Sequence, residues 1–230
     1  FMIEEPPLLT LNSGFARPAP DQLAALAGVQ TGFVADAMGG RGALDHRIKP
    51  LAPLAAPLVG TAMTCHCGPA DNLALFAALA TARPGDVLVA ATDAFTGTAV
   101  TGDLLLGMAR NRGIAGLVTD GLARDLPGIL AVGLPAFCAG LTPNSPVRNG
   151  PGTVGLPVVL GGVAVSAGDI IVADNDGVVV IPRDSAAEVI TQIAAVRAAE
   201  AALDAAVKAG LELPDFVTSL LAGPRVRRLP

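Results

Sequence analysis

The sequence predicts an α/β fold in which a parallel or mixed sheet is covered by helices. Apolar stretches with strand character alternate with helical stretches through the middle of the chain, and this alternation is typical of layered α/β domains. The 27 Gly and 19 Pro residues indicate many tight turns between short elements. The core is expected to be aliphatic, because 52% of the residues are hydrophobic while there are only seven Phe and no Trp or Tyr.

Composition also narrows the classes of partner. A net charge of −5 without a long basic run argues against nucleic acid or an anionic membrane. No apolar run reaches the length of about 18 residues that a membrane span needs. Three cysteines and an N-terminus without an apolar signal region favour a reducing compartment, so we expect a cytoplasmic protein.

Residues 1–40 are expected to form an N-terminal arm whose proline-rich first half wraps the surface. Asp21 is predicted to cap a short helix over 22–27, and a second helix is predicted over 32–38. Asp36 projects from that second helix, and the residues alone favour reading it as a solvated carboxylate.

Residues 41–57 are predicted to be a loop because prolines interrupt them, and residues 58–67 to be a strand. Within that strand Cys65 and Cys67 point to one face and His66 to the other. Three consecutive strand residues cannot converge on one tetrahedral ion, so we interpret them as packing residues.

The central and C-terminal elements follow from the same reading of apolar periodicity and turn residues. Asp71 is expected to cap the first of these helices. Helices are predicted over 72–82, 103–112, 126–131 and 184–208, and strands over 84–92, 114–121, 134–140, 153–160, 163–166, 169–175 and 177–182. The chain is predicted to be one domain, 1–230, with the arm at 1–40 and a C-terminal helix at 184–210 that packs on another chain.

One stretch, Gly102 to Asp125, combines residue types suited to binding a small oxo acid. The first amides of a helix lack intrahelical partners, so a carboxylate is expected to bind at the amides near Gly102, Leu104 and Leu105. Arg124 offers a planar fork for a carboxylate, and Asp125 is a hard oxygen ligand for a divalent metal.

Together these groups would bind pyruvate as a metal chelate and stabilise its enolate. No lysine lies in this stretch, which disfavours a Schiff-base route. Arg-Asp dipeptides are common, so a surface ion pair beside a turn remains the simpler alternative from spacing alone.

The motifs, taken together, resemble the RraA-like family, which includes 4-hydroxy-4-methyl-2-oxoglutarate aldolases and a regulator of ribonuclease activity. The resemblance is carried over roughly residues 30–215 by PGDVLV, TGDLLLGMARNRGIAGLVTDGLARD, GLPAFCAGLTPNSP and GGVAVSAGDIIVADNDGVVVIP. It implies a swivelling β/β/α-type domain that assembles as a homotrimer or a homohexamer.

The resemblance also implies roles for individual residues. Arg124 is similar to the substrate-binding arginine and Asp125 to the metal ligand, with Mg²⁺ as the expected ion and Mn²⁺ or Co²⁺ as alternatives. The run Gly102, Asp103, Leu104 and Leu105 resembles the pyruvate carboxylate site, and Asp103 the residue that positions a proton-donating water. Asp36 and Glu200 resemble acidic residues that complete the site, with Asp36 supplied by a neighbouring subunit.

The sequence departs from the family pattern at three places, which all bear on the other half of the substrate. The Gly-rich stretch before the helix reads ATDAFTGTAV, and the usual CPPGDN run reads CGPADN with Ala70 at the glycine position. Asp36 is one methylene shorter than the usual glutamate.

We therefore expect a class II pyruvate aldolase that cleaves a 4-hydroxy-2-oxo acid such as 4-hydroxy-4-methyl-2-oxoglutarate, with oxaloacetate decarboxylation as a side activity. The alternative is a non-catalytic protein that binds and inhibits a ribonuclease; retention of Arg124 and Asp125 favours the enzyme. A quinone methyltransferase is disfavoured, because no G-x-G-x-x-G loop follows a strand.

Overall fold

The computed structural model of the protein describes residues 5–229, so the first four positions of the predicted arm lie outside the described residues. The chain divides into two compact units between Ile193 and Ala194. The first unit contains all the strands and the helices that pack on them, and the second contains most of the long C-terminal helix and a short helix after it.

The first unit is built on a nine-stranded mixed sheet, which confirms the predicted fold class. Its order is β1-β9-β3-β4-β6-β8-β2, and β12 pairs with β3 while β13 pairs with β12. The strands are β1 (Leu9–Leu11), β2 (Lys49–Pro50), β3 (Leu58–His66), β4 (Asp86–Ala91), β6 (Gly116–Thr119), β8 (Ala136–Cys138), β9 (Gly152–Val154), β12 (Ile170–Ala173) and β13 (Val178–Ile181). The central strands β3, β4, β6 and β8 run parallel and are almost wholly buried, as expected for strands covered on both faces.

Two smaller sheets complete the strand set among the described residues. Strands β10 (Val158–Leu160) and β11 (Val163–Val165) form an antiparallel hairpin. Strands β5 (Ala99–Thr101) and β7 (Leu122–Ala123) pair in parallel, although a helix and a strand separate them in the sequence. This second pairing matters most for function, because it sets the two ends of the Gly102 to Asp125 stretch beside each other.

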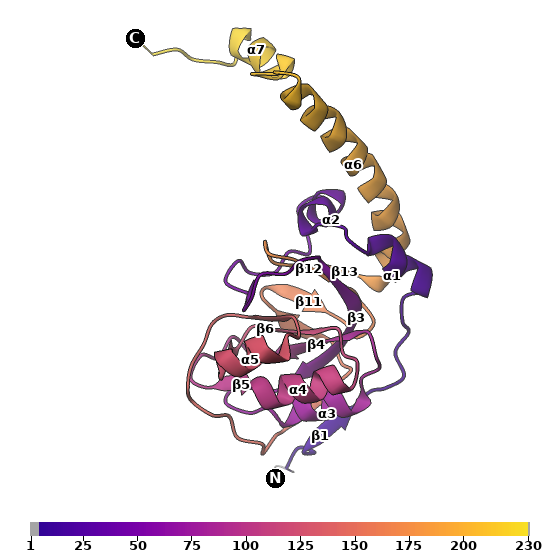
Figure 1. The fold of residues 1–230 in the computed structure, drawn as a ribbon, viewed down its shortest axis with the longest axis vertical. Helices are drawn as coiled ribbons and strands as arrows, with labels where there is room; N and C mark the ends of the chain where they lie inside the picture. Colours follow the sequence, from indigo (N-terminus) through magenta and orange to yellow (C-terminus); the bar gives the residue numbers. More distant parts are fainter. Residues whose placement is uncertain (1–4, 230) are drawn as a thin grey trace, which may run out of the picture. The chain divides into compact units, whose positions relative to one another are not determined.

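The helices fall into two groups around the large sheet (Figure 1). Helices α3 (Leu73–Thr81), α4 (Asp103–Asn111) and α5 (Leu126–Val132) share one apolar core with β3, β4 and β6. Helices α1 (Pro20–Leu26) and α2 (Thr31–Ala37) and the start of α6 (Ala186–Lys208) share another core with β12 and β13. Helix α7 (Asp215–Ala222) belongs to the second unit, and none of its residues is buried.

Several predicted boundaries were wrong for identifiable reasons. Helix α1 begins at Pro20, so Asp21 lies in its first turn and Ala19 is the capping residue. Helix α2 begins at Thr31, because the Asp174 carboxylate accepts both the amide N–H and the hydroxyl of that residue. The strand predicted over 153–160 is divided at Gly155, whose left-handed backbone passes so close to Asn12 that no side chain would fit.

Other elements were not foreseen. The predicted loop 41–57 contains β2, the proline-rich arm contains β1, and α7 follows the long helix, which itself begins at Ala186 after a 3-10 turn. None of the helices in the described part of the chain is both long and apolar enough to cross a membrane. The single-domain expectation stays a prediction.

Candidate functional site

The pairing of β5 with β7 places the beginnings of two helices side by side. Ala99 pairs with Leu122 and Thr101 with Ala123, and the Arg124 N–H donates to the Thr101 carbonyl oxygen at 3.1 Å. Each of the two strands is followed directly by a helix. Gly102, after β5, is the N-cap of α4, and Asp125, after β7, is the N-cap of α5. Two helix N-termini, whose first amides lack intrahelical partners, therefore lie close together, an arrangement that favours binding of an anion.

Arg124 and Asp125 form a partly exposed ion pair at this place. Arg124 Nε lies 3.0 Å from Asp125 Oδ2, and the side chains are 37% and 43% exposed. Asp125 adopts a left-handed backbone, with φ 64° and ψ 43°. Another guanidinium nitrogen, Nη1, donates to the Ser145 hydroxyl, so Arg124 is held from two sides while both charged groups stay accessible to a ligand.

Gly102 is the residue that lets this pair approach the α4 N-terminus. A Cβ atom placed there would lie 2.8 Å from Asp125 Oδ2 and 3.3 Å from Arg124 Cγ, closer than ordinary contact. The backbone at Gly102 is extended, with φ −156°, so the requirement is for space and not for an unusual conformation. The glycine thus fixes how near the carboxylate can come to the helix amides.

Asp103 begins α4 and faces α5. Its Oδ1 accepts the Leu104 N–H at 2.7 Å, so that amide is engaged by the neighbouring side chain in this structure. A Cβ at Gly128 of α5 would lie 2.2 Å from Asp103 Oδ2, so the absence of a side chain at Gly128 leaves the space that the Asp103 carboxylate occupies. Leu104 is 79% exposed whereas Leu105 is buried, so only the latter side chain anchors the helix.

A pocket of about 220 Å³ opens over these groups. It brings together six of the eight site residues that the sequence predicted, from two stretches of chain, with groups from α3 and the 142–151 loop. Its lining residues are Asn72, Phe76, Thr101, Gly102, Asp103, Leu104, Leu105, Arg124, Asp125, Ser145, Pro146 and Arg148.

Four polar lining residues, Asn72, Thr101, Ser145 and Arg148, were not predicted from the sequence. The Arg148 guanidinium lies 5.0 Å from the centre of the Phe76 ring, a cation–π distance, and adds a second positive group to the pocket wall. The loop that carries Arg148 is held by the carboxylate of Asp71, which accepts backbone N–H groups of residues 149 and 150. Because these contacts join segments that are far apart in the sequence, the spacing of residues within one segment could not have predicted them.

The other two predicted site residues lie elsewhere. Asp36 is exposed on α2, which packs on β12 and β13, and it does not line the pocket. A role for Asp36 therefore requires another copy of the chain. Glu200 lies on the part of α6 that belongs to the second unit, and its role stays a prediction.

The donor set at Asp125 is compatible with a hydrated divalent ion. Within residues 5–229 no three His, Cys, Asp or Glu side chains gather as a closed metal site. A single accessible carboxylate instead suits Mg²⁺, which keeps several waters and takes its remaining ligands from the substrate. Asp125 would hold such an ion through its partly exposed carboxylate.

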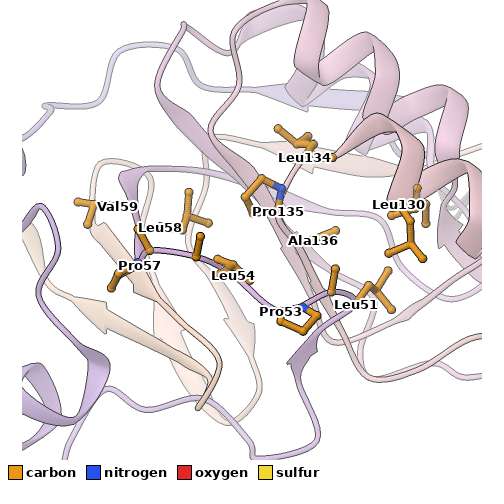
Figure 2. Close-up of a pocket in the computed structure, with 15 residues that line it drawn as sticks. Leu51, Pro53, Leu54, Pro57, Leu58, Val59, Leu130, Leu134, Pro135 and Ala136 are labelled. Atoms are coloured by element: carbon orange, nitrogen blue, oxygen red, sulfur yellow. The ribbon is translucent and has the colours of Figure 1, made fainter.

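A larger cavity of about 520 Å³ lies away from these groups (Figure 2). It is lined by residues 51–59 together with parts of α5 and β8, and Figure 2 shows Leu51, Leu54, Leu130 and Leu134 among its side chains. None of its lining residues carries an ionisable side chain. The larger cavity therefore lacks the groups that acid–base or metal chemistry needs.

The fold and the pocket define an α/β protein in which a helix N-terminus and an Arg–Asp pair share one pocket. The model of the RraA-like family, described as Aldolase/RraA, matches residues 31–180. The chain belongs to this family, which confirms the resemblance seen in the sequence.

Some relatives are named as aldolases and others as ribonuclease inhibitors. A protein of Halalkalibacterium halodurans named "Putative 4-hydroxy-4-methyl-2-oxoglutarate aldolase" is 41% identical over 155 residues, which are 67% of this chain and 73% of that protein. An uncharacterised Pseudomonas syringae protein has a similar structure, with a TM-score of 0.75 and 27% identity, covering 86% of this chain and 96% of that one. Streptomyces coelicolor RraAS2, described as an unusual member of the RNase ES inhibitor RraA family, gives a TM-score of 0.68 and 32% identity over 77% of this chain and 92% of that one.

Proposed function

We propose that the protein is a class II pyruvate aldolase that cleaves a 4-hydroxy-2-oxo acid and has oxaloacetate decarboxylase side activity. The observation that carries the proposal is the accessible Arg124–Asp125 pair, placed against the N-terminus of α4 by the β5–β7 pairing. A surface ion pair beside an ordinary turn would need neither the glycine clearance at Gly102 nor a pocket lined by two guanidinium groups.

Each group has a defined task in this proposal. The amides at the start of α4 and the Arg124 guanidinium bind the oxo-acid end of the substrate and stabilise negative charge on it. A divalent ion at Asp125 would supply Lewis-acid polarisation of the 2-oxo group. The 4-hydroxyl loses its proton to water, the bond between C3 and C4 breaks, and its electron pair remains on the pyruvate enolate. A water positioned by Asp103 then protonates that enolate at carbon.

A coupled assay of pyruvate release tests the chemistry. Arg124→Ala is expected to lower kcat/KM by about 100-fold, since the charge-stabilising donor is lost. Arg41→Ala is the matched control, because Arg41 is an exposed arginine whose Nε donates to the Met38 carbonyl oxygen and which lies outside the pocket. Full activity of the wild-type protein in excess chelator, or of the Arg124 variant, would refute the mechanism.

We also propose that the active form is a homotrimer or homohexamer in which Asp36 of one chain completes the pocket of another. The exposure of Asp36 and its absence from the pocket lining of its own chain support this arrangement. Asp36→Ala and Arg124→Ala are each expected to be about 100-fold less active than the wild type, whereas co-refolding the two restores roughly a quarter of the sites if a site spans two chains. Continued inactivity of the mixture would show that each site is confined to one chain.

The second candidate function is binding and inhibition of a ribonuclease, which the description of the Streptomyces coelicolor relative favours. A ribonuclease E-type enzyme assayed with and without the purified protein distinguishes the two. Inhibition that persists in Arg124→Ala, in a protein that releases no pyruvate, would establish the regulator. Pyruvate release without inhibition would establish the enzyme.

A further inference from the structure

Arg148 is a second cation in the pocket that contains Arg124 and Asp125. Its side chain is exposed, so a ligand that enters the pocket can reach it. In the described part of the chain no carboxylate pairs with Arg148, whereas Arg124 is paired with Asp125. The Arg148 guanidinium lies 5.0 Å from the centre of the Phe76 ring, and this cation–π contact holds it at the pocket wall.

The backbone on both sides of Arg148 is fixed to the segment that precedes α3. Val147 donates its N–H to the Ala70 carbonyl oxygen at 2.8 Å, and its own carbonyl oxygen accepts the Asn72 N–H at 3.1 Å. Beyond Arg148, the Asp71 carboxylate accepts the next two backbone N–H groups. Because the loop is already ordered, an anion that binds Arg148 does not have to offset the entropy of ordering that loop.

The loop that carries Arg148 also contacts Arg124. Ser145, three residues before Arg148, accepts a hydrogen bond from Arg124 Nη1. Cα atoms three residues apart lie at most about 11 Å from each other, and both arginines line the same pocket of about 220 Å³. A small molecule with an anionic group at each end is therefore the ligand that this pair of guanidinium groups fits.

We propose that Arg148, held by Phe76 and by the fixed loop, binds a carboxylate at the end of the substrate opposite the oxo acid and thereby determines specificity. The proposal rests on the function proposed above, in which Arg124 binds the oxo-acid end. A guanidinium offers two parallel N–H donors to a carboxylate, whereas a methyl group at that end would gain nothing from Arg148. Arg148 takes no part in bond breaking.

The test compares two ligands that differ only at that end, 2-oxoglutarate and 2-oxopentanoate. Neither has the 4-hydroxyl group that retro-aldol cleavage requires. Calorimetry on the whole chain with Mg²⁺ is expected to show that the wild-type protein binds 2-oxoglutarate about tenfold more tightly. Arg148→Met keeps an unbranched apolar stem beside Phe76 and removes the charge. It is expected to bring the ratio of the two dissociation constants close to one and to leave the dissociation constant of 2-oxopentanoate unchanged.

Two further variants separate the contact from general effects. Arg41→Met is the matched control, because Arg41 is an exposed arginine outside this pocket and the change removes the same charge. The wild-type ratio is expected in this control. Phe76→Leu keeps Arg148 but removes the ring that holds its guanidinium, and it is expected to lower the ratio about threefold.

Three results would overturn the role of Arg148: no preference or no binding in the wild-type protein, a preference that survives in Arg148→Met, or an equal weakening of both ligands in that variant. The third result would mean that Arg148 only supports the shape of the pocket. Failure of this proposal is separable from failure of the aldolase proposal, since pyruvate release from a 4-hydroxy-2-oxo acid is measured independently of the binding ratio.

Discussion

Gly102→Ala is expected to impair the site while leaving the fold intact. The added Cβ would lie 2.8 Å from Asp125 Oδ2, about 0.6 Å short of the 3.4 Å at which ordinary contact begins. The carboxylate, as the end of a side chain, can move away at little energetic cost, and the extended backbone at Gly102 accepts alanine without strain. The change at the N-cap costs about 1 kcal/mol or less.

The cost is instead expected in catalysis, because Asp125 and Arg124 would both be displaced from the α4 amides. Misplacement of a reacting group by about 1 Å lowers rates by about 100-fold, so kcat/KM for pyruvate release is expected to fall by about that factor. Gly107→Ala on the same helix is the control, since its Cβ would meet only Val132 at 3.8 Å. If Gly102→Ala stays within twofold of Gly107→Ala in kcat/KM at equal thermal stability, the clearance argument is refuted.

Three further predictions concern two substitutions near the pocket and the labelling of two buried cysteines. Asp71→Ala removes the acceptor for the backbone N–H groups of Leu73, Asn149 and Gly150. The free energy of unfolding, measured by urea titration, is therefore expected to fall by roughly 3 kcal/mol. A loss no larger than that of the exposed control Asp21→Ala would contradict this expectation. Arg148→Ala is expected to raise KM for a dicarboxylate substrate about tenfold by removing the second guanidinium of the pocket, and an unchanged KM would exclude Arg148 from binding. A hydrogen bond with Cys67, together with burial, raises the pKa of the Cys65 thiol, and burial raises the pKa of Cys138, so both thiols stay protonated at pH 8. Alkylation followed by mass spectrometry should therefore label them only after unfolding, when their pKa returns to about 8.5; rapid labelling of the native protein at pH 8 would contradict this.

The parts of the fold that were predictable from sequence depend on local periodicity. The alternation of apolar helices and strands correctly indicated the parallel strands β3, β4, β6 and β8 and the helices between them. Boundaries failed where a distant residue decides them. Thr31 joins α2 because Asp174 accepts its amide, and residues 153–160 form two strands because Gly155 passes close to Asn12.

The same distinction separates the foreseen site residues from the missed ones. Gly102, Arg124 and Asp125 lie in one recognisable stretch, so the sequence could group them, and the family resemblance favoured a shared site over a surface ion pair. Asn72 and Arg148 reach the pocket only through tertiary contacts, namely the bond from Asn72 to the Val100 carbonyl oxygen and the contacts of Asp71 with the 142–151 loop. Sequence spacing contains no information on either contact.

Two glycines explain how two carboxylates pack closely against helices α4 and α5 at this pocket. Gly102 makes room for Asp125 and Gly128 makes room for Asp103, so the missing side chain on each helix accommodates a carboxylate of the other. Helices α4 and α5 thereby set the two acidic groups close to their N-terminal amides without either backbone adopting a left-handed conformation at the glycine. Helix propensity does not favour glycine over alanine at Gly128, which lies inside α5, so the space needed by Asp103 gives the reason for having glycine there. The clearance between the two helices, and not the Arg-Asp dipeptide alone, is therefore what distinguishes this site from a surface ion pair.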